Sequence, residues 1–220
     1  MNKGLDMNIR SLILPATLVL CTCALPAMAR GPQGGGQFAG QGGQGMGQGV
    51  QAPVAVLSAE EADTLLWMRE EEKLAHDVYL TLDAQWDLVV LQRIAVSEQR
   101  HFDALGGKIE RYGLADPVLP GAGVFSDPEL QALYEELVAS GLESSTQALV
   151  VGATIEDLDI LDLQQAIDAT VQPDLQRTYG HLLEGSKNHL RAFVGELRAL
   201  GLDYEPQYID PLFFDAIVGL

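Results

Sequence analysis

The chain has 220 residues, with 31 Asp and Glu against 13 Lys and Arg, so its formal net charge is −18 at pH 7. A chain this acidic repels nucleic acid and anionic membranes, which excludes both as partners. Both cysteines, Cys21 and Cys23, lie near the N-terminus, so the rest of the chain has no thiol for a disulfide, a thiolate metal site or a c-type haem.

Residues 1–29 have the pattern of a secretory signal peptide. Lys3 and Arg10 give it a positive start, an apolar stretch follows, and Ala27-Met28-Ala29 supplies a small-residue cleavage site. The apolar stretch is too short and too interrupted by proline for a membrane span. We therefore expect a periplasmic or secreted protein that is not inserted in the membrane.

Residues 30–52 consist almost wholly of Gly and Gln. They hold too little apolar material to offset the entropy lost on ordering, so we expect a disordered tether. A specific interaction made through Gln and Gly is the alternative. Residues 53–220 are long enough to form one domain with a full hydrophobic core.

The first two long helices are marked by their ends. The capping box Ser58-Ala59-Glu60-Glu61 predicts the start of a helix over about residues 59–84. A second helix is predicted over about residues 90–112, because Gly113 then provides a C-terminal cap. Both segments carry apolar residues at spacings of three and four, which predicts one buried face on each helix.

A long connection over residues 113–143 follows the second helix. Proline and glycine make its first half irregular, and Pro128 suits the first turn of a short helix that ends near Gly141. Two further long helices are predicted over about residues 145–170 and 173–200. No alternation typical of strands competes with this pattern.

The order of these elements predicts an all-α fold. Short links join the first long helix to the second and the third to the fourth, and the long connection joins the second to the third. This is the topology of a ferritin-like four-helix bundle with one crossover that carries a short extra helix. The aromatic tail after residue 201 is expected to pack on the bundle.

Polar residues interrupt the apolar faces of all four long helices at comparable depth. An apolar face does not accept a carboxylate or an imidazole unless something compensates it, and a metal ion is the usual compensation. Glu98 and His101 are spaced i, i+3, which puts both on one face of the second helix. The interrupting residues are Glu72 on the first helix, Glu98 and His101 on the second, Glu156 and Asp159 on the third, and Ser186 and His189 on the fourth.

The donor types indicate which metal such a site prefers. Four carboxylates balance the charge of two divalent ions, and oxygen donors with imidazole and no sulfur favour iron, with manganese as the second option. A buried carboxylate–histidine network without metal is one alternative. In another, Asp159 faces solvent together with Asp157 and Asp162. His76, one turn after Glu72, is expected at the surface or behind the ligands.

The same residues resemble a known superfamily. Glu72 with Tyr79, the run Glu98-Gln99-Arg100-His101-Phe102-Asp103 and Glu156 are similar to the first three helices of bacterioferritins and rubrerythrins. A closer similarity, over about residues 57–218, is to an uncharacterised bacterial ferritin-like family known only as a domain of unknown function. The runs that carry it are Arg69 to Ala75, Ser97 to His101 and Gly185 to Arg191.

This resemblance implies metal ligands at Glu72, Glu98, His101, Glu156 and His189. The fourth helix departs from the di-iron pattern, because Ser186 stands where Glu-x-x-His has its glutamate. We expect Asp159 to supply the missing carboxylate from the neighbouring helix. Tyr79, seven residues after Glu72 on the same face, is the candidate catalytic residue.

The leading functional hypothesis is an exported non-haem protein with two iron ions that reacts with dioxygen or peroxide, as a ferroxidase or a peroxide reductase. The alternative is a non-catalytic metal-binding or protein-interaction module displayed on the tether. The electron donor is unidentified, and a homodimer is left open.

The acidic cluster also predicts how stability should respond to metal and pH. Without metal, the crowded carboxylates should take up protons, so the protein should gain stability as the pH falls toward about 5. Protonation of His101 and His189 is expected to oppose that trend. Glu98→Gln and Glu156→Gln should each weaken metal binding but stabilise the metal-free protein at pH 7.

Overall fold

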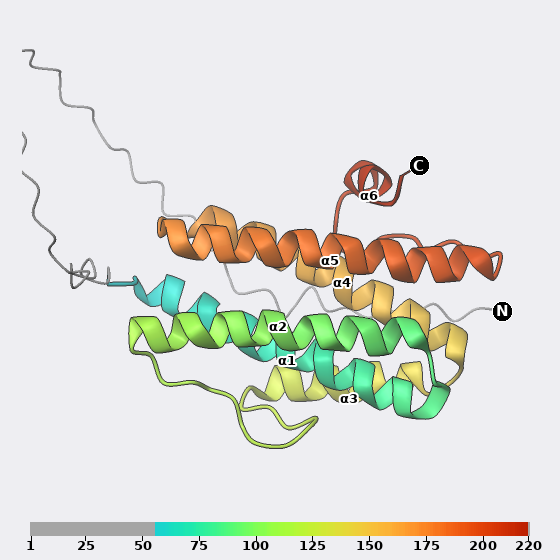
Figure 1. Ribbon diagram of the computed structural model, residues 1–220, viewed down its shortest axis with the longest axis horizontal. Coiled ribbons are helices and arrows are strands. Elements are labelled where there is room, and N and C mark those ends of the chain that lie inside the picture. The colour runs from blue at the N-terminus through green and yellow to red at the C-terminus, as the bar shows by residue number, and fades with distance from the viewer. Residues whose placement is uncertain (1–55, 220) are drawn as a thin grey trace, which may run out of the picture. The chain divides into compact units, whose positions relative to one another are not determined.

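The computed structural model describes residues 56–219, which fold into six helices with no strand among them. The all-α prediction is confirmed for this part of the chain. The predicted signal peptide, residues 1–29, and the predicted tether, residues 30–52, lie outside it. The helices are α1 (Ala59–Trp86), α2 (Val89–Tyr112), α3 (Pro128–Gly141), α4 (Ser145–Ala169), α5 (Pro173–Ala199) and α6 (Pro211–Val218) (Figure 1).

The four long helices begin and end within two residues of the predicted positions. At the start of α1, the Ser58 hydroxyl accepts from the Glu61 backbone N–H and the Glu61 carboxylate accepts from the Ser58 N–H, so the predicted capping box is present. Gly113 ends α2 in the left-handed conformation, with φ of 68°. Local capping chemistry therefore sets these helix ends.

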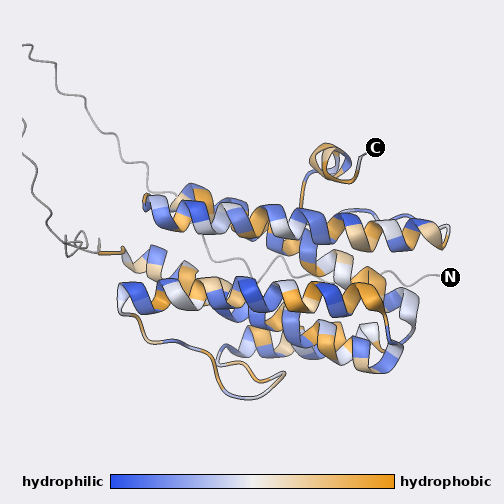
Figure 2. Ribbon diagram, viewed as in Figure 1, coloured by the Kyte–Doolittle hydropathy of each residue, from blue (hydrophilic) through white to orange (hydrophobic). Residues whose placement is uncertain are grey.

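The long helices pack side by side as a helical bundle. Helix α1 lies along α2, α4 lies along α5, and the two pairs meet through contacts between α1 and α4 and between α2 and α5. Figure 2 shows polar and apolar residues mixed along each long helix. The apolar side chains of Leu65, Leu91 and Leu163 are fully buried between the helices. None of the described helices is long and apolar enough to cross a bilayer.

A run of charged residues on α1 is buried because a second layer covers it. Arg69, Glu70 and Lys73 are each at most 9% exposed. The Glu70 carboxylate accepts hydrogen bonds from the backbone N–H and the hydroxyl of Ser126, at 2.9 and 2.8 Å. The Lys73 ammonium donates to the carbonyl of Gly121 at 2.9 Å. These bonds hold the connection between α2 and α3 on α1, while α3 itself packs against α1 and α4.

The C-terminal tail packs on the bundle, as expected, and contains a helix, α6, that was not predicted. Asp157 on α4 is fully buried and accepts a hydrogen bond from the Tyr204 hydroxyl at 2.9 Å. The same carboxylate accepts from the backbone N–H groups of Gln207, Tyr208 and Ile209. Asp210 then caps α6, with Pro211 in its first turn. The alternative that Asp157 faces solvent is wrong.

Candidate metal centre

The structure brings five of the predicted ligands together in the interior of the bundle. Glu72, Glu98 and His101 form one group in which a donor atom of each lies within 4.8 Å of the others. Glu98, Glu156 and His189 form a second group by the same measure. Glu98 belongs to both groups, so α2 supplies the residue that joins the two halves of the site.

The short distances in the site run between histidine Nδ1 atoms and carboxylate oxygens. His101 Nδ1 lies 2.9 Å from Glu98 Oε2 and 3.3 Å from Glu72 Oε2. His189 Nδ1 lies 2.7 Å from Glu98 Oε1 and 3.4 Å from Glu156 Oε2. The two imidazole rings are stacked, with their centroids 5.5 Å apart. Each histidine therefore faces one pair of carboxylates.

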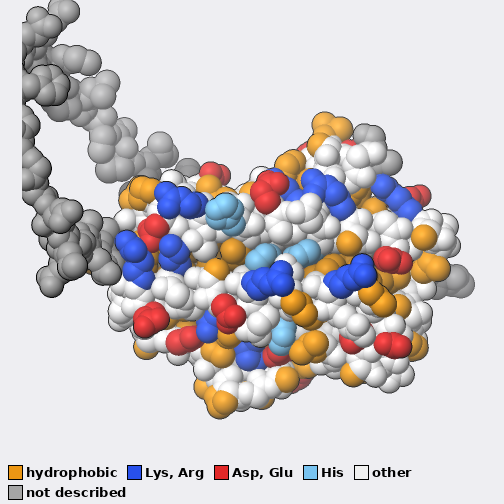
Figure 3. All heavy atoms as spheres, viewed as in Figure 1, with side chains coloured by type: hydrophobic (Ala, Val, Ile, Leu, Met, Phe, Trp, Pro, Cys, Tyr) orange, Lys and Arg blue, Asp and Glu red, His pale blue; other side chains and the backbone are white. Residues whose placement is uncertain are grey.

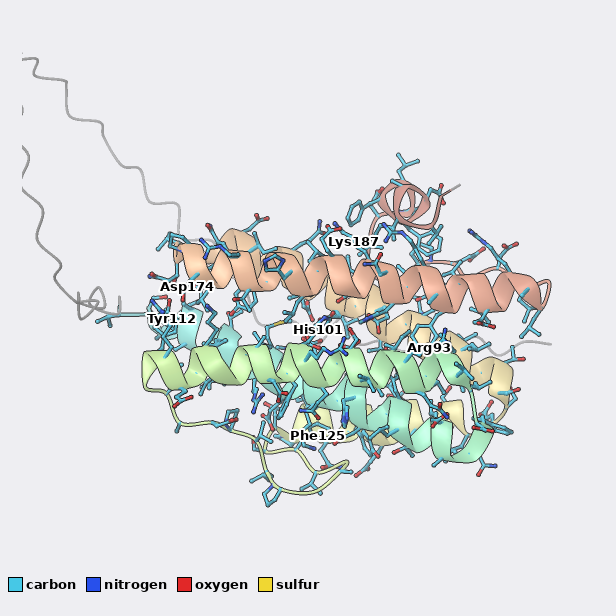
Figure 4. The ribbon with its side chains drawn as sticks, viewed as in Figure 1. Arg93, His101, Tyr112, Phe125, Asp174 and Lys187 are labelled. Atoms are coloured by element: carbon cyan, nitrogen blue, oxygen red, sulfur yellow. The ribbon has the colours of Figure 1, made fainter. Side chains whose placement is uncertain are left out.

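The site is enclosed on most sides. Glu72, Glu98 and Glu156 are at most 2% exposed. The His101 side chain keeps 12% of its surface exposed. Figure 4 places it between α2 and α5, and Figure 3 shows histidine side chains at the surface of the same face. The imidazole of His101 is the most exposed of the grouped side chains.

Several donor atoms in this site are buried without a hydrogen-bond partner. They are Glu72 Oε1, Glu98 Oε1, Asp159 Oδ1, His101 Nδ1 and His189 Nδ1. Buried polar atoms are normally paired, so Glu72 Oε1 and Asp159 Oδ1, which have no close polar contact, each carry a cost of about 1–3 kcal/mol unless something else binds them. The donor set of carboxylate oxygens and imidazole nitrogens fits a divalent metal such as iron or manganese. The histidine nitrogens and carboxylate oxygens lie close together but do not meet the angles of hydrogen bonds. This favours metal binding over a network of hydrogen bonds among the side chains themselves.

Asp159 is buried beside the two groups and belongs to neither. It is 7% exposed, so the alternative in which it faces solvent is wrong. Its Oδ2 atom contacts the hydroxyl of Ser186, which is fully buried on α5. Burial and the nearby Glu156 carboxylate raise the pKa of Asp159 to about 8. Asp159 thus contacts Ser186, the residue of α5 that stands where the di-iron pattern has a glutamate.

Tyr79 contacts the site through one ligand. Its hydroxyl donates to Glu156 Oε1 at 2.6 Å, and the residue is fully buried. Burial and the Glu156 charge raise the pKa of Tyr79 well above its ordinary value, so the phenol keeps its proton. His76 does not join the site, because its Nδ1 instead lies 2.9 Å from Asp77.

The charges of the metal-free site are strongly coupled. Burial opposes the charge of His101, but the carboxylates of Glu72 and Glu98 raise its pKa to about 11. Burial likewise opposes the charge of His189, and Glu156 and Glu98 raise its pKa to about 10. Burial raises the pKa values of Glu72 and Glu156. Burial would also raise the pKa of Glu98, but the two imidazoles lower it well below its ordinary value.

Two acidic residues next to the site were not predicted. Glu71 on α1 is 6% exposed, and Asp162 on α4 is half-buried. From the sequence alone, the run Glu70-Glu71-Glu72 is typical of a helix face exposed to solvent. The burial of this face comes from α3 and α4, which both contact α1, and spacing along one helix does not reveal those contacts. The one feature of the sequence that could have pointed to Glu71 is its place in a run of three glutamates on a helix with a buried apolar face.

One family model spans every candidate ligand. Residues 61–219 match the family model described as "Uncharacterized protein domain (DUF2202)". The chain is 48% identical over 168 residues to the uncharacterized protein MJ0754 of Methanocaldococcus jannaschii. This alignment covers 76% of this chain and 91% of the relative. It is similar to the crystal structure of the hypothetical protein MJ0754 from Methanococcus jannaschii, with a TM-score of 0.75 and 47% identity over 77% of this chain and 97% of that chain.

Proposed function

We propose that this chain, which belongs to the DUF2202 family, is a ferritin-like bundle that holds two non-haem iron ions and reacts with dioxygen or peroxide. The ferritin-like assignment is supported by two helix pairs joined through the connection between α2 and α3. Manganese is the second metal that the donor set suits.

The observation that carries the proposal is the position of Glu98. Its two oxygens face different histidines: Oε2 lies 2.9 Å from His101 Nδ1, and Oε1 lies 2.7 Å from His189 Nδ1. A carboxylate that belongs to two neighbouring sets of donor atoms can bind two adjacent cations, one through each oxygen. Glu98 Oε1 and both Nδ1 atoms have no hydrogen-bond partner, which supports metal binding over a role in packing.

The residues would divide the work as follows. Glu72 and His101 would hold one ion, Glu156 and His189 the other, and Glu98 both. Asp159 is the additional carboxylate available to the centre. Iron(II) bound there would supply the electrons that reduce dioxygen or peroxide. The nearly complete burial of the carboxylates would keep bulk water away from ions bound there.

Tyr79 acts through Glu156 and is therefore a positioning residue. By donating to Oε1, its hydroxyl leaves Oε2, the oxygen nearer His189, available to a metal. The phenol would also hold a proton next to Glu156, a residue that would bind one of the ions.

Anaerobic titration with iron(II), followed by exposure to dioxygen or peroxide, tests the proposal. We expect about two ions per chain, and consumption of the oxidant in proportion to the iron bound. Glu98→Gln should abolish both. Stoichiometric binding without oxidant consumption would support the non-catalytic metal-binding module instead, and absence of binding would refute the centre.

We also propose that the chain is exported, on the basis of the signal pattern in residues 1–29. N-terminal sequencing of protein recovered from the periplasm or medium should then start at Arg30. An intact N-terminus on cytoplasmic protein would contradict export.

A further inference from the structure

Arg69 on α1 lies against α2 one residue beyond His101. Its Nη1 group donates to the backbone carbonyl of Phe102, and its Cζ atom lies 3.2 Å from the centre of the Phe102 ring. Its Nη2 group donates to Asp116 Oδ2 at 3.1 Å, in the connection that follows α2. One buried side chain therefore joins α1, α2 and the connection between α2 and α3.

Gly106 provides the space that the guanidinium occupies. A Cβ atom at position 106 would lie 2.8 Å from Arg69 Nη1 and 2.9 Å from Arg69 Cζ. Phe102 and Gly106 are spaced i, i+4, which puts both on one face of α2. A side chain at position 106 would therefore push the guanidinium away from the Phe102 carbonyl. A Cβ atom at Gly107, the next residue, would meet nothing within 4 Å.

The guanidinium is costly to place here. Arg69 is 9% exposed, and its Nε atom is buried without a hydrogen-bond partner. Its one ion pair among the described residues is with Asp116, whose side chain is 41% exposed. An apolar side chain would fill this space without burying an incompletely paired charge, whereas a planar guanidinium fixes the directions of its hydrogen bonds. These contacts therefore favour a role in positioning α2 over a role in packing alone.

The contact between Arg69 and Phe102 adjoins the half of the centre that Glu72 and His101 would form. Glu72 follows Arg69 by about one helical turn on α1, and His101 directly precedes Phe102 on α2. His101 Nδ1 lies 3.3 Å from Glu72 Oε2. The same stretches of α1 and α2 are thus joined twice, and the bond from Arg69 fixes the helix spacing at which Glu72 meets His101.

We propose that Arg69 is a positioning residue for the two-metal centre, because its bond to the Phe102 carbonyl keeps His101 at the distance from Glu72 at which both bind one ion. This inference rests on the proposed function. Glu156 and His189, in the other half, come from α4 and α5. In the described part of the chain, the hydrogen bonds and the ion pair of Arg69 go to neither helix. Arg69 should therefore affect one ion selectively.

Anaerobic iron(II) titration of two neighbouring glycine variants tests the inference. Gly106→Ala should displace the guanidinium and lower the affinity for one ion at least about tenfold, while the other ion binds as in wild type. His101→Ala, which removes the ligand itself, identifies the binding step that should weaken. Gly107→Ala is the matched control and should bind both ions normally, because it makes the same change where the space is open. Equal binding in the two glycine variants would overturn the inference.

Removing Arg69 separates positioning from a general loosening of the fold. Arg69→Met leaves an unbranched side chain that ends before the guanidinium, and it should weaken the same ion as Gly106→Ala does. Adding Gly106→Ala to Arg69→Met should cause no further loss of affinity, because no guanidinium remains to be displaced. Additive losses in the double variant would show that the two residues act separately and would refute the proposed role.

The same titrations distinguish failure of this inference from failure of the proposed function. Wild-type protein that binds no iron refutes both. If wild type binds two ions and Arg69→Met binds two ions equally tightly, only the role of Arg69 is refuted. Urea unfolding of the metal-free variants completes the comparison, since a loss of stability with normal binding of both ions would show that Arg69 serves the fold and not the centre.

Discussion

Gly185 on α5 provides the space that the His101 ring occupies. A Cβ atom at position 185 would lie 2.6 Å from His101 Nε2 and 2.7 Å from Cε1. The His101 ring cannot retreat freely, because its Nδ1 atom lies close to the carboxylates of Glu72 and Glu98. The absence of a side chain at 185 therefore belongs to the geometry of the centre.

Gly185→Ala should displace His101 and weaken the half of the centre that it shares with Glu72. We expect the affinity for one ion to fall at least about tenfold, or about 1.4 kcal/mol, while the ion near His189 is retained. Gly180→Ala on the same helix meets nothing within 4 Å, so it should bind metal normally and gain up to about 1 kcal/mol of stability. Equal metal binding in the two variants would contradict the role of Gly185.

Neutralising the ligands should have opposite effects on the metal-free protein, depending on the ligand. Glu156→Gln removes a carboxylate whose pKa burial raises, so it should stabilise the metal-free fold at pH 7. Glu98→Gln removes a carboxylate whose charge the two imidazoles stabilise, so it should destabilise that fold. For Glu98 this differs from the sequence-based expectation that both variants stabilise the metal-free fold. Urea unfolding of both variants without metal, which should shift in opposite directions, provides the test.

The metal-free protein should become more stable as the pH falls from about 8 to about 5. Asp159, with a folded pKa of about 8, and Glu72 and Glu156, with raised values, contribute stability that is lost as the pH rises through those folded values. His101 and His189, at about 11 and 10, contribute stability that is complete below 6.5 and lost toward those values.

The histidines should therefore reinforce the trend, unlike the sequence-based expectation that they oppose it, because neighbouring carboxylates stabilise the imidazolium form. Glu98 acts in the opposite direction, but only below its ordinary pKa of 4.5. Thermal unfolding with a chelator should show a rise of more than about 1 kcal/mol, the free energy of one pKa unit at one group. A fall over the same range would refute the charge assignments.

The sequence was sufficient for the parts of the fold and site that depend on spacing along one helix. Glu98 and His101 were found because they interrupt an apolar stripe, and the capping residues located the helix ends. Glu71 and Asp162 were missed because their burial comes from contacts among three helices, which no single periodicity encodes. Gly185 was missed as a functional position for the same reason, because its neighbour His101 lies on another helix.

Tyr79→Phe should preserve metal binding and slow the reaction with the oxidant. The substitution leaves Glu156 Oε1 without its 2.6 Å hydrogen bond and removes the buried proton beside the centre. The metal-free fold should lose about 1–3 kcal/mol. Tyr179→Phe is the matched control, because the Tyr179 residue is 1% exposed and its hydroxyl has no partner to lose. If both variants consume oxidant at the same rate, Tyr79 does not act in the reaction.

Moving one carboxylate between helices tests whether Asp159 replaces the glutamate that α5 lacks. Asp159→Ala should lower the affinity for the ion near His189 and leave the fully buried Ser186 hydroxyl without its carboxylate partner. Adding Ser186→Glu to Asp159→Ala places a carboxylate three residues before His189 on the same helical face, so affinity should recover. Ser186→Glu alone should bind metal but destabilise the metal-free protein, because it crowds a further carboxylate against Asp159. Iron(II) titration of the three variants gives the comparison. A double variant that binds no better than Asp159→Ala would show that position 159 does not serve as the replacement.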